Sequence, residues 1–293
     1  MYQNQITQFS DARMQQPNKY MRRESFLVVL DSRNASEYIN GSKNSWVEFE
    51  ILDVIKRPAD CLYMTMCVHS FTCPVSFYII NSTNNVLSIT LTSITYVLTV
   101  PVGNYNVTSF ISYLTTALAS LTSTTFTITM NDINNILTIT NSNFEFSINS
   151  TSTIYQIMGF KQATSYTSSN KSLTLPFTVN FSGLNSFNIQ IENIKTSNLD
   201  SYDNCISNII AVVPVNADAN ETLYYEKRND FEFDVRESII DYFEVQLLDD
   251  KNNYLDLNNQ HFNLTLQINF IRDVIDDSDL KFNDIVSIGQ NYF

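Results

Sequence analysis

The side chains best suited to nucleophilic or metal chemistry in this chain are two histidines, His69 and His261, and four cysteines. His69 falls within an alternating strand pattern and His261 follows the turn-like run LDLNNQ, so we interpret both as structural residues. The sequence contains no GxSxG, HExxH, Walker-type or GxGxxG motif, and five glycines leave little for a phosphate-binding loop. We therefore assign no catalytic, cofactor-binding or metal-ligating residue, and expect neither enzymatic activity nor a cofactor.

The cysteines are Cys61, Cys67, Cys73 and Cys205, and the first three are six residues apart. This spacing does not match the short cysteine pairs of structural zinc sites. A chain of this size needs no disulfide framework, and an intracellular one keeps its thiols reduced. We interpret the cysteines as small buried hydrophobic residues of a protein made in a reducing compartment.

Paired carboxylates are the remaining candidates for chemistry, because glycoside hydrolases use two of them. The candidates are Glu232 with Asp234, on the polar face of a predicted strand, and Asp249 with Asp250, in a predicted turn. We interpret both pairs as solvated surface. The aspartates of 273–279 lack the residue order and central glycine of an EF-hand, which argues against a calcium site.

The charge balance limits the classes of partner. The chain has 30 acidic and 17 basic residues, a formal net charge of −13, which repels polyanions. Nucleic-acid binding by the folded body is therefore disfavoured. The remaining candidate for contact with DNA is the N-terminal arm, which contains Arg13, Lys19, Arg22 and Arg23. The first residues have no apolar signal-peptide core, and no apolar stretch approaches the roughly 18 residues of a membrane span.

Hydrophobic alternation with period two dominates from residue 25 onward and predicts strands with one buried face. In SWVEFEIL, for example, Val47 and Phe49 share one face while Glu48 and Glu50 take the other. The same alternation recurs in the segments around 62–68, 126–130, 144–148, 187–191, 231–235 and 262–268. So many alternating segments with little helix predict an antiparallel β-sandwich or barrel.

One region departs from this pattern. Apolar residues at helical spacing predict a helix from Val107 to Leu118, with Asn106 as its N-cap, and a short helical turn is predicted before Gly159. Between them, the turn-prone run 131–135 joins two strands as a hairpin. We predict an inserted α+β subdomain at 82–172.

The remaining segments then form a sandwich split into 25–81 and 173–272, with an N-terminal arm at 1–24 and a C-terminal tail at 273–293. The arm is either a disordered tail or a segment that orders against a neighbouring subunit. Tyr224, Tyr225, Tyr242 and Tyr254 flank turns and acidic residues, where amphipathic rings commonly pack against a partner chain.

Several stretches resemble the jelly-roll penton and minor capsid proteins of large double-stranded DNA viruses and their virophages. They are VEFEILDVIKRPADCLYMTMCVHSFTCPVSFYIIN, the inserted GNYNVTSFISYLTTAL with IYQIMGF, and the closing block from IIAVVPVNA through YYE to LDLNNQHFNLTLQINFI. The resemblance spans about residues 45–272, and the closing block is its most distinctive part.

The resemblance implies a mainly β fold, a single jelly roll with an inserted α+β subdomain, that assembles as a homopentamer at icosahedral vertices. It implies contact with the major capsid protein, a location in the virion after synthesis in the host cytoplasm, and no catalytic residue. Three alternatives stay open: a peripheral minor capsid protein, a glycan- or receptor-binding β-sandwich, and a carboxylate-based hydrolase.

Overall fold

The computed structural model describes residues 21–195, 198–200, 205–226 and 232–273. The chain divides into two compact units. The first contains the chain up to Pro74, the segment Phe187–Pro214 and the chain from Thr222 onward, and the second contains Val75–Ser186 and Val215–Glu221.

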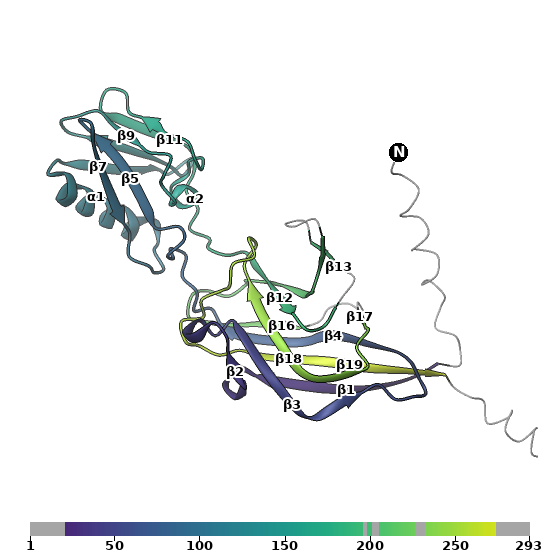
Figure 1. The fold of residues 1–293 in the computed structure, drawn as a ribbon. Helices are drawn as coiled ribbons and strands as arrows, with labels where there is room; N and C mark the ends of the chain where they lie inside the picture. Colours follow the sequence, from purple (N-terminus) through teal and green to yellow (C-terminus); the bar gives the residue numbers. More distant parts are fainter. Residues whose placement is uncertain (1–20, 196–197, 201–204, 227–231, 274–293) are drawn as a thin grey trace, which may run out of the picture. The chain divides into compact units, whose positions relative to one another are not determined.

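The first unit consists almost entirely of antiparallel strands (Figure 1). Its strands are β1 (Met21–Asp31), β2 (Glu37–Tyr38), β3 (Trp46–Lys56), β4 (Cys61–Pro74), β12 (Ser186–Ile191), β13 (Asn198–Asp200), β14 (Cys205–Ser207), β15 (Ile209–Pro214), β16 (Thr222–Glu226), β17 (Phe233–Val235), β18 (Ile239–Leu248) and β19 (Asn263–Asp273). Two short 3₁₀ helices, Ser32–Asn34 and Gly41–Lys43, lie between β1 and β3.

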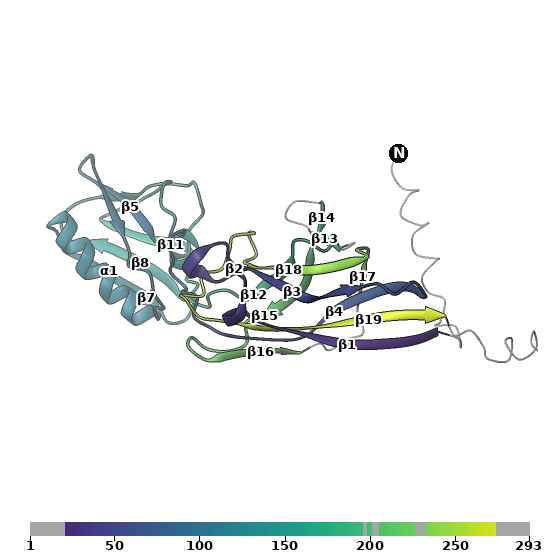
Figure 2. The ribbon, with the colours of Figure 1, turned by 60° about the horizontal axis from the view of Figure 1, so that its bottom comes forward.

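The strands form two main sheets, in the orders β1-β19-β4-β16 and β15-β12-β18-β3-β2, with β17 also paired to β4, and β13 pairs with β14 in a separate two-stranded sheet. Among the eight principal strands of these sheets, the first pairs with the last (β1 and β19), the second with the seventh (β3 and β18), the third with the sixth (β4 and β16) and the fourth with the fifth (β12 and β15). Figure 2 shows β1, β19 and β4 in one layer and β3 and β18 in the other. This connectivity is a single jelly roll, as the sequence resemblance implied.

Aromatic side chains from both sheets meet in the core of the first unit. Phe71 of β4 packs edge-on against Phe187 of β12, with ring centroids 5.6 Å apart. Phe262, which precedes β19, contacts both Phe71 at 5.6 Å and Phe49 of β3 at 6.4 Å. All four rings are buried, so truncating one of them to alanine removes about 3–5 kcal/mol of stability.

Two irregularities in β4 change which of its residues face inward. Val68 pairs with Leu266 and Ser70 with Thr265, so His69 has no partner on β19, and Leu62 is skipped in the same way between Tyr63 and Cys61. The alternating pattern predicted that Leu62 shares one buried face with Met64, Met66 and Val68. In the structure Leu62 is exposed. Strict alternation is wrong there because an extra residue in one strand reverses the side-chain phase.

The second unit packs two small sheets and a helix around one hydrophobic core. Its elements are β5 (Val86–Leu91), β6 (Ile94–Thr99), α1 (Val107–Thr122), β7 (Phe126–Asn131), β8 (Ile136–Asn141), β9 (Phe146–Ile148), α2 (Tyr155–Met158), β10 (Tyr166–Thr167) and β11 (Ser172–Thr178). The sheet orders are β10-β9-β5-β6 and β11-β8-β7. Both predicted helices and the β7–β8 hairpin are present.

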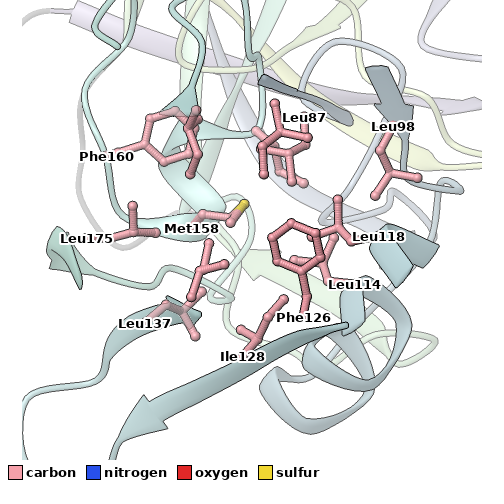
Figure 3. Packing of buried hydrophobic residues seen from close by; sticks show 14 of the residues in the cluster. Leu87, Leu98, Leu114, Leu118, Phe126, Ile128, Leu137, Met158, Phe160 and Leu175 are labelled. Atoms are coloured by element: carbon pink, nitrogen blue, oxygen red, sulfur yellow. The ribbon is translucent and has the colours of Figure 1, made fainter. Parts of the chain in front are cut away.

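Helix α1 begins at a capping box and buries one face. Asn106 accepts a hydrogen bond from the Ser109 N–H at 2.8 Å, and the Ser109 hydroxyl lies 3.1 Å from the Asn106 N–H, which satisfies two amides of the first turn. One helical face then places Leu114 and Leu118 against Phe126 and Ile128 of β7 (Figure 3). The unit is therefore the α+β subdomain that the sequence predicted.

Its boundaries differ from the predicted 82–172. Strand β11 was assigned to the split sandwich, but it pairs with β8, and its Leu173 and Leu175 enter the core of the second unit. Ile80 is buried in the same core and pairs with Gly103. Alternation finds a strand but does not say which sheet it joins, because that depends on pairing with residues far along the chain.

Replacing Gly159 with alanine should lower the free energy of unfolding by about 2–4 kcal/mol. Gly159 has a φ of 84°, and a Cβ there would lie only 2.7 Å from the Thr178 carbonyl oxygen. Gly41→Ala is the matched control, because Gly41 also has positive φ (62°) but nothing within 4 Å of its Cβ position. Urea denaturation followed by circular dichroism measures both, and equal losses would contradict the close packing of α2 on β11.

Candidate assembly surfaces

Strand β1 forms an edge of its sheet, since its partners in the described part of the chain all lie on β19. Its outward face carries Leu27 and Val29, which are 53% and 68% exposed. An 11-residue edge strand with an apolar outward face is the kind of surface that pairs readily with another chain. We call this surface, the free edge of β1 together with Leu27 and Val29 on its outward face, the β1 edge.

A polar network on the same face fixes the start of β1 to the middle of the sheet. Glu232 accepts hydrogen bonds from Thr65 at 2.6 Å and Asn269 at 3.1 Å, and it forms an ion pair with Arg23. The Ser25 hydroxyl donates to Asn269 at 2.7 Å. Because Thr65 and Asn269 are buried, removing one partner leaves another unsatisfied, at a cost of about 1–3 kcal/mol. The edge strand is thus held in a defined position.

Further exposed apolar side chains lie near one end of the sandwich, on strands of both sheets that flank the turn 57–60. They are Leu52 of β3, which is 90% exposed, Leu62 of β4 and Ile239 of β18. Arg272 ties β19 to this turn through Asp60 at 2.6 Å. We call Leu52, Leu62 and Ile239 the end patch.

His261 contacts a serine, but the pair cannot act as a nucleophile and base. The Ser32 hydroxyl lies 3.2 Å from His261 Nδ1 and accepts the Phe262 N–H at 2.9 Å. Ser32 is fully buried, so no substrate reaches its oxygen. The contact closes the junction between β1 and β19. His69 is the unpaired residue of the β4 irregularity and is partly buried.

An open hollow of about 340 Å³ lies beside His261 and is lined also by Arg33, Thr72, Thr222 and Asn263. The Arg33 guanidinium is bound to Asp31, with Nε 3.0 Å from both carboxylate oxygens. This hydrogen bond lowers the pKa of the Asp31 carboxyl and neutralises the cation. None of the residues lining the hollow is a carboxylate, so it does not provide the paired carboxylates that a glycoside hydrolase needs.

The two predicted carboxylate pairs differ in burial and in hydrogen bonding. Glu232 is not solvated surface as we expected, because the network described above holds it in a partly buried position. Its burial arises from contacts with β1 and β19, which lie far from it in sequence. Asp249 accepts the N–H groups of Lys251 and Asn253, both at 2.8 Å, and so builds the predicted turn. Asp273 ends β19, and the other aspartates of 273–279 lie outside the described residues.

The tyrosines expected at interfaces are dispersed over the first unit. Tyr224 of β16 is 56% exposed, whereas Tyr225 and Tyr242 are partly buried. Tyr254 stacks on Trp46, with ring centroids 4.8 Å apart and planes at 10°. Their contact with a partner chain stays a prediction.

Cys61, Cys67 and Cys73 are buried free thiols, as predicted, and Cys205 lies in β14. Burial raises the pKa of the Cys73 thiol to about 12. Across the described residues, no three histidine, cysteine or acidic side chains are arranged to hold a metal ion. Nor is any helix in that part of the chain both long and apolar enough to cross a membrane.

No protein-family model matches the chain, and no curated protein matches it in sequence. Among solved structures, the chain is similar to the mavirus penton protein with a TM-score of 0.48 and 11% sequence identity. The match covers 84% of this chain and 99% of that one.

Between about pH 9 and 12 the stability of the protein should fall as the pH rises, in part because of Cys73. Its folded-state pKa is raised, so the unfolded chain releases the thiol proton first, and stability present below the unfolded pKa is lost above it. Cys73→Ala should make the decline shallower between pH 9 and 11, by up to about 1.4 kcal/mol per pH unit. Urea denaturation at several pH values measures this slope, and an unchanged slope would contradict the assignment.

Proposed function

We propose that this chain is a structural subunit of a viral capsid, and within that class the penton subunit that assembles as a ring of five at icosahedral vertices. The observation that carries the proposal is the β1 edge, a long edge strand whose outward apolar side chains are bare in the single chain. Head-to-tail contact in a closed ring covers such an edge on every copy. The sequence resemblance to jelly-roll penton proteins supports the same role.

The partners that we propose are further copies of the chain and the major capsid protein. The β1 edge is suited to contact between copies, and the end patch is a separate apolar surface for a second protein. The net charge of −13 keeps free subunits soluble before assembly. No catalytic role is assigned, because Ser32 is inaccessible and Glu232 is held by structural contacts.

Light scattering of the full chain during size exclusion tests the assembly. We expect a particle of five times the 33.6 kDa chain mass at high concentration. A strict monomer at all concentrations that is also absent from purified virions would contradict the capsid role. A different defined oligomer found in virions would favour a peripheral minor capsid protein.

The double substitution Leu27→Lys and Val29→Lys should weaken assembly at least about tenfold while leaving the fold intact, because both side chains are exposed and lysine desolvates poorly at an apolar interface. Ile133→Lys is the control, since Ile133 is 94% exposed in the β7–β8 turn of the second unit. Sedimentation velocity gives the association constant, and circular dichroism checks the fold. Unchanged association would exclude the β1 edge from the interface.

A further inference from the structure

Four glutamates form a row across the outward face of the second jelly-roll sheet. Glu37 of β2 pairs with Glu48 of β3, and Glu48 pairs with Glu244 of β18. Glu192, directly after β12, continues the row, because its N–H bonds to the Glu244 carbonyl oxygen at 2.9 Å. We call these four residues the glutamate row.

The glutamate row has no positive counterpart in the described part of the chain. The ion pairs found there involve Arg22, Arg23, Arg33 and Arg272, and none of them reaches a glutamate of the row. Like charges directly opposite one another on neighbouring strands destabilise a sheet. The isolated subunit therefore carries a repulsion that a cationic partner would relieve.

A side-chain amide next to the glutamate row is available to a ligand. Gln246 of β18 is 5% exposed, and its backbone position is opposite Trp46 on β3 and Gln190 on β12. Its side chain makes no hydrogen bond to any of the described residues, and its amide atoms are not fully buried. It lies on the same face as Glu244, two residues away along the strand, so its amide can hydrogen-bond to a polar chain that lies across the row.

Aromatic rings lie beside Glu244 and Glu192 of the row. Trp46 donates from Nε1 to Glu244 at 2.6 Å, and its ring stacks on Tyr254. Burial, and then the charges of Glu192 and Glu244, raise the pKa of the Tyr254 hydroxyl, so this ring lies close to both carboxylates. Carboxylates beside aromatic faces suit arginine and lysine side chains, which combine ion pairing with stacking.

A divalent metal ion fits this arrangement poorly. Carboxylates on successive strands are spaced along a line at about the 4.8 Å strand separation, whereas calcium needs oxygens converging at about 2.4 Å. Consistent with this, the described residues hold no group of three suitable ligands. The occupant should instead be an extended chain with spaced positive charges.

The segment 12–20 of this protein has that chemistry. It contains Arg13 and Lys19, and no acidic residue occurs anywhere from 12 to 23. It leads directly into β1, which begins at Met21 opposite Asp273, at the end of the sandwich where β19 also meets Cys61 of β4.

The length of chain between Lys19 and β1 decides whether Lys19 can contact the row of its own copy or only that of a neighbouring copy. Glu48 is eight residues along β3 from Lys56, which precedes the turn into β4, so the row lies about 26 Å from that end of the sandwich. Lys19 is two residues from Met21 and can extend only about 7 Å from it. Within one copy Lys19 therefore cannot reach the row, whereas Arg13, eight residues from Met21, can extend about 28 Å. In an assembly a neighbouring copy can present both residues, so Lys19 is the residue that distinguishes the two cases.

We propose that residues 12–20 of one copy bind across the glutamate row of a neighbouring copy. The inference rests on the proposed assembly and gives it a specific contact. Arg13 and Lys19 would neutralise the row, and the polar segment would hydrogen-bond to the Gln246 amide. The contact also leaves the β1 edge free for its own interface.

Zero-length carbodiimide cross-linking of the full chain tests this contact. Mixing ¹⁴N- and ¹⁵N-labelled copies distinguishes contacts between copies from contacts within one. We expect Lys19 joined to Glu48 or Glu244 in mixed-isotope pairs. An assembled particle in which Lys19 joins the row only within one copy, or not at all, would overturn this inference and leave the proposed function standing. A protein that never assembles overturns this inference, and if it is also absent from purified virions the proposed function is overturned as well.

The double substitution Glu37→Gln and Glu48→Gln supplies a second readout that does not depend on cross-linking. It should raise the melting temperature of the monomer by about 2 °C or more through relief of repulsion, and weaken binding of a synthetic peptide of residues 12–23 at least about tenfold. Asp132→Asn with Asp250→Asn removes the same charge elsewhere and should do neither. Equal effects of the two double variants would show that only net charge matters and would overturn the proposal.

Discussion

The pairing of β1 with β19 is the constraint on which the first unit depends. Its 11 residue pairs run from Met21 opposite Asp273 to Asp31 opposite Asn263, so the sheet forms only after nearly the whole described chain has been brought together. Strand β19 then pairs with β4 on its other side, so the last strand lies between the first strand and β4. Such non-local pairing predicts slow folding.

The same arrangement explains how a second unit can interrupt the jelly roll. Strand β4 belongs to one sheet and β12 to the other, so the chain must in any case leave the first sheet between them. The entropy cost of a longer connection grows only with the logarithm of its length, and the inserted unit has its own buried core to offset it. Neither sheet loses a strand pairing to the insertion.

Much of this fold could be predicted from local patterns, because the face that a residue occupies is set by its immediate neighbours. Val47 and Phe49 alternate with glutamates and are buried, and Asn106 caps α1 as its residue type suggests. The predictions that were wrong concern strand register and strand pairing, which depend on residues far away in the sequence. The phase change at His69 depends on β19, and the place of β11 depends on β8. The glutamate row belongs to the same class, because Glu48 and Glu244 meet only through the pairing of β3 with β18.

The protein has one tryptophan, and it occupies a special position. Trp46 is stacked on Tyr254 and hydrogen-bonded to Glu244, so its indole borders the row of carboxylates. The tryptophan fluorescence of the protein therefore comes from one position on the jelly roll. The inserted unit contains no tryptophan and does not contribute to it. An unlabelled sample thus carries a natural optical probe of this face, sensitive to the polarity around one ring.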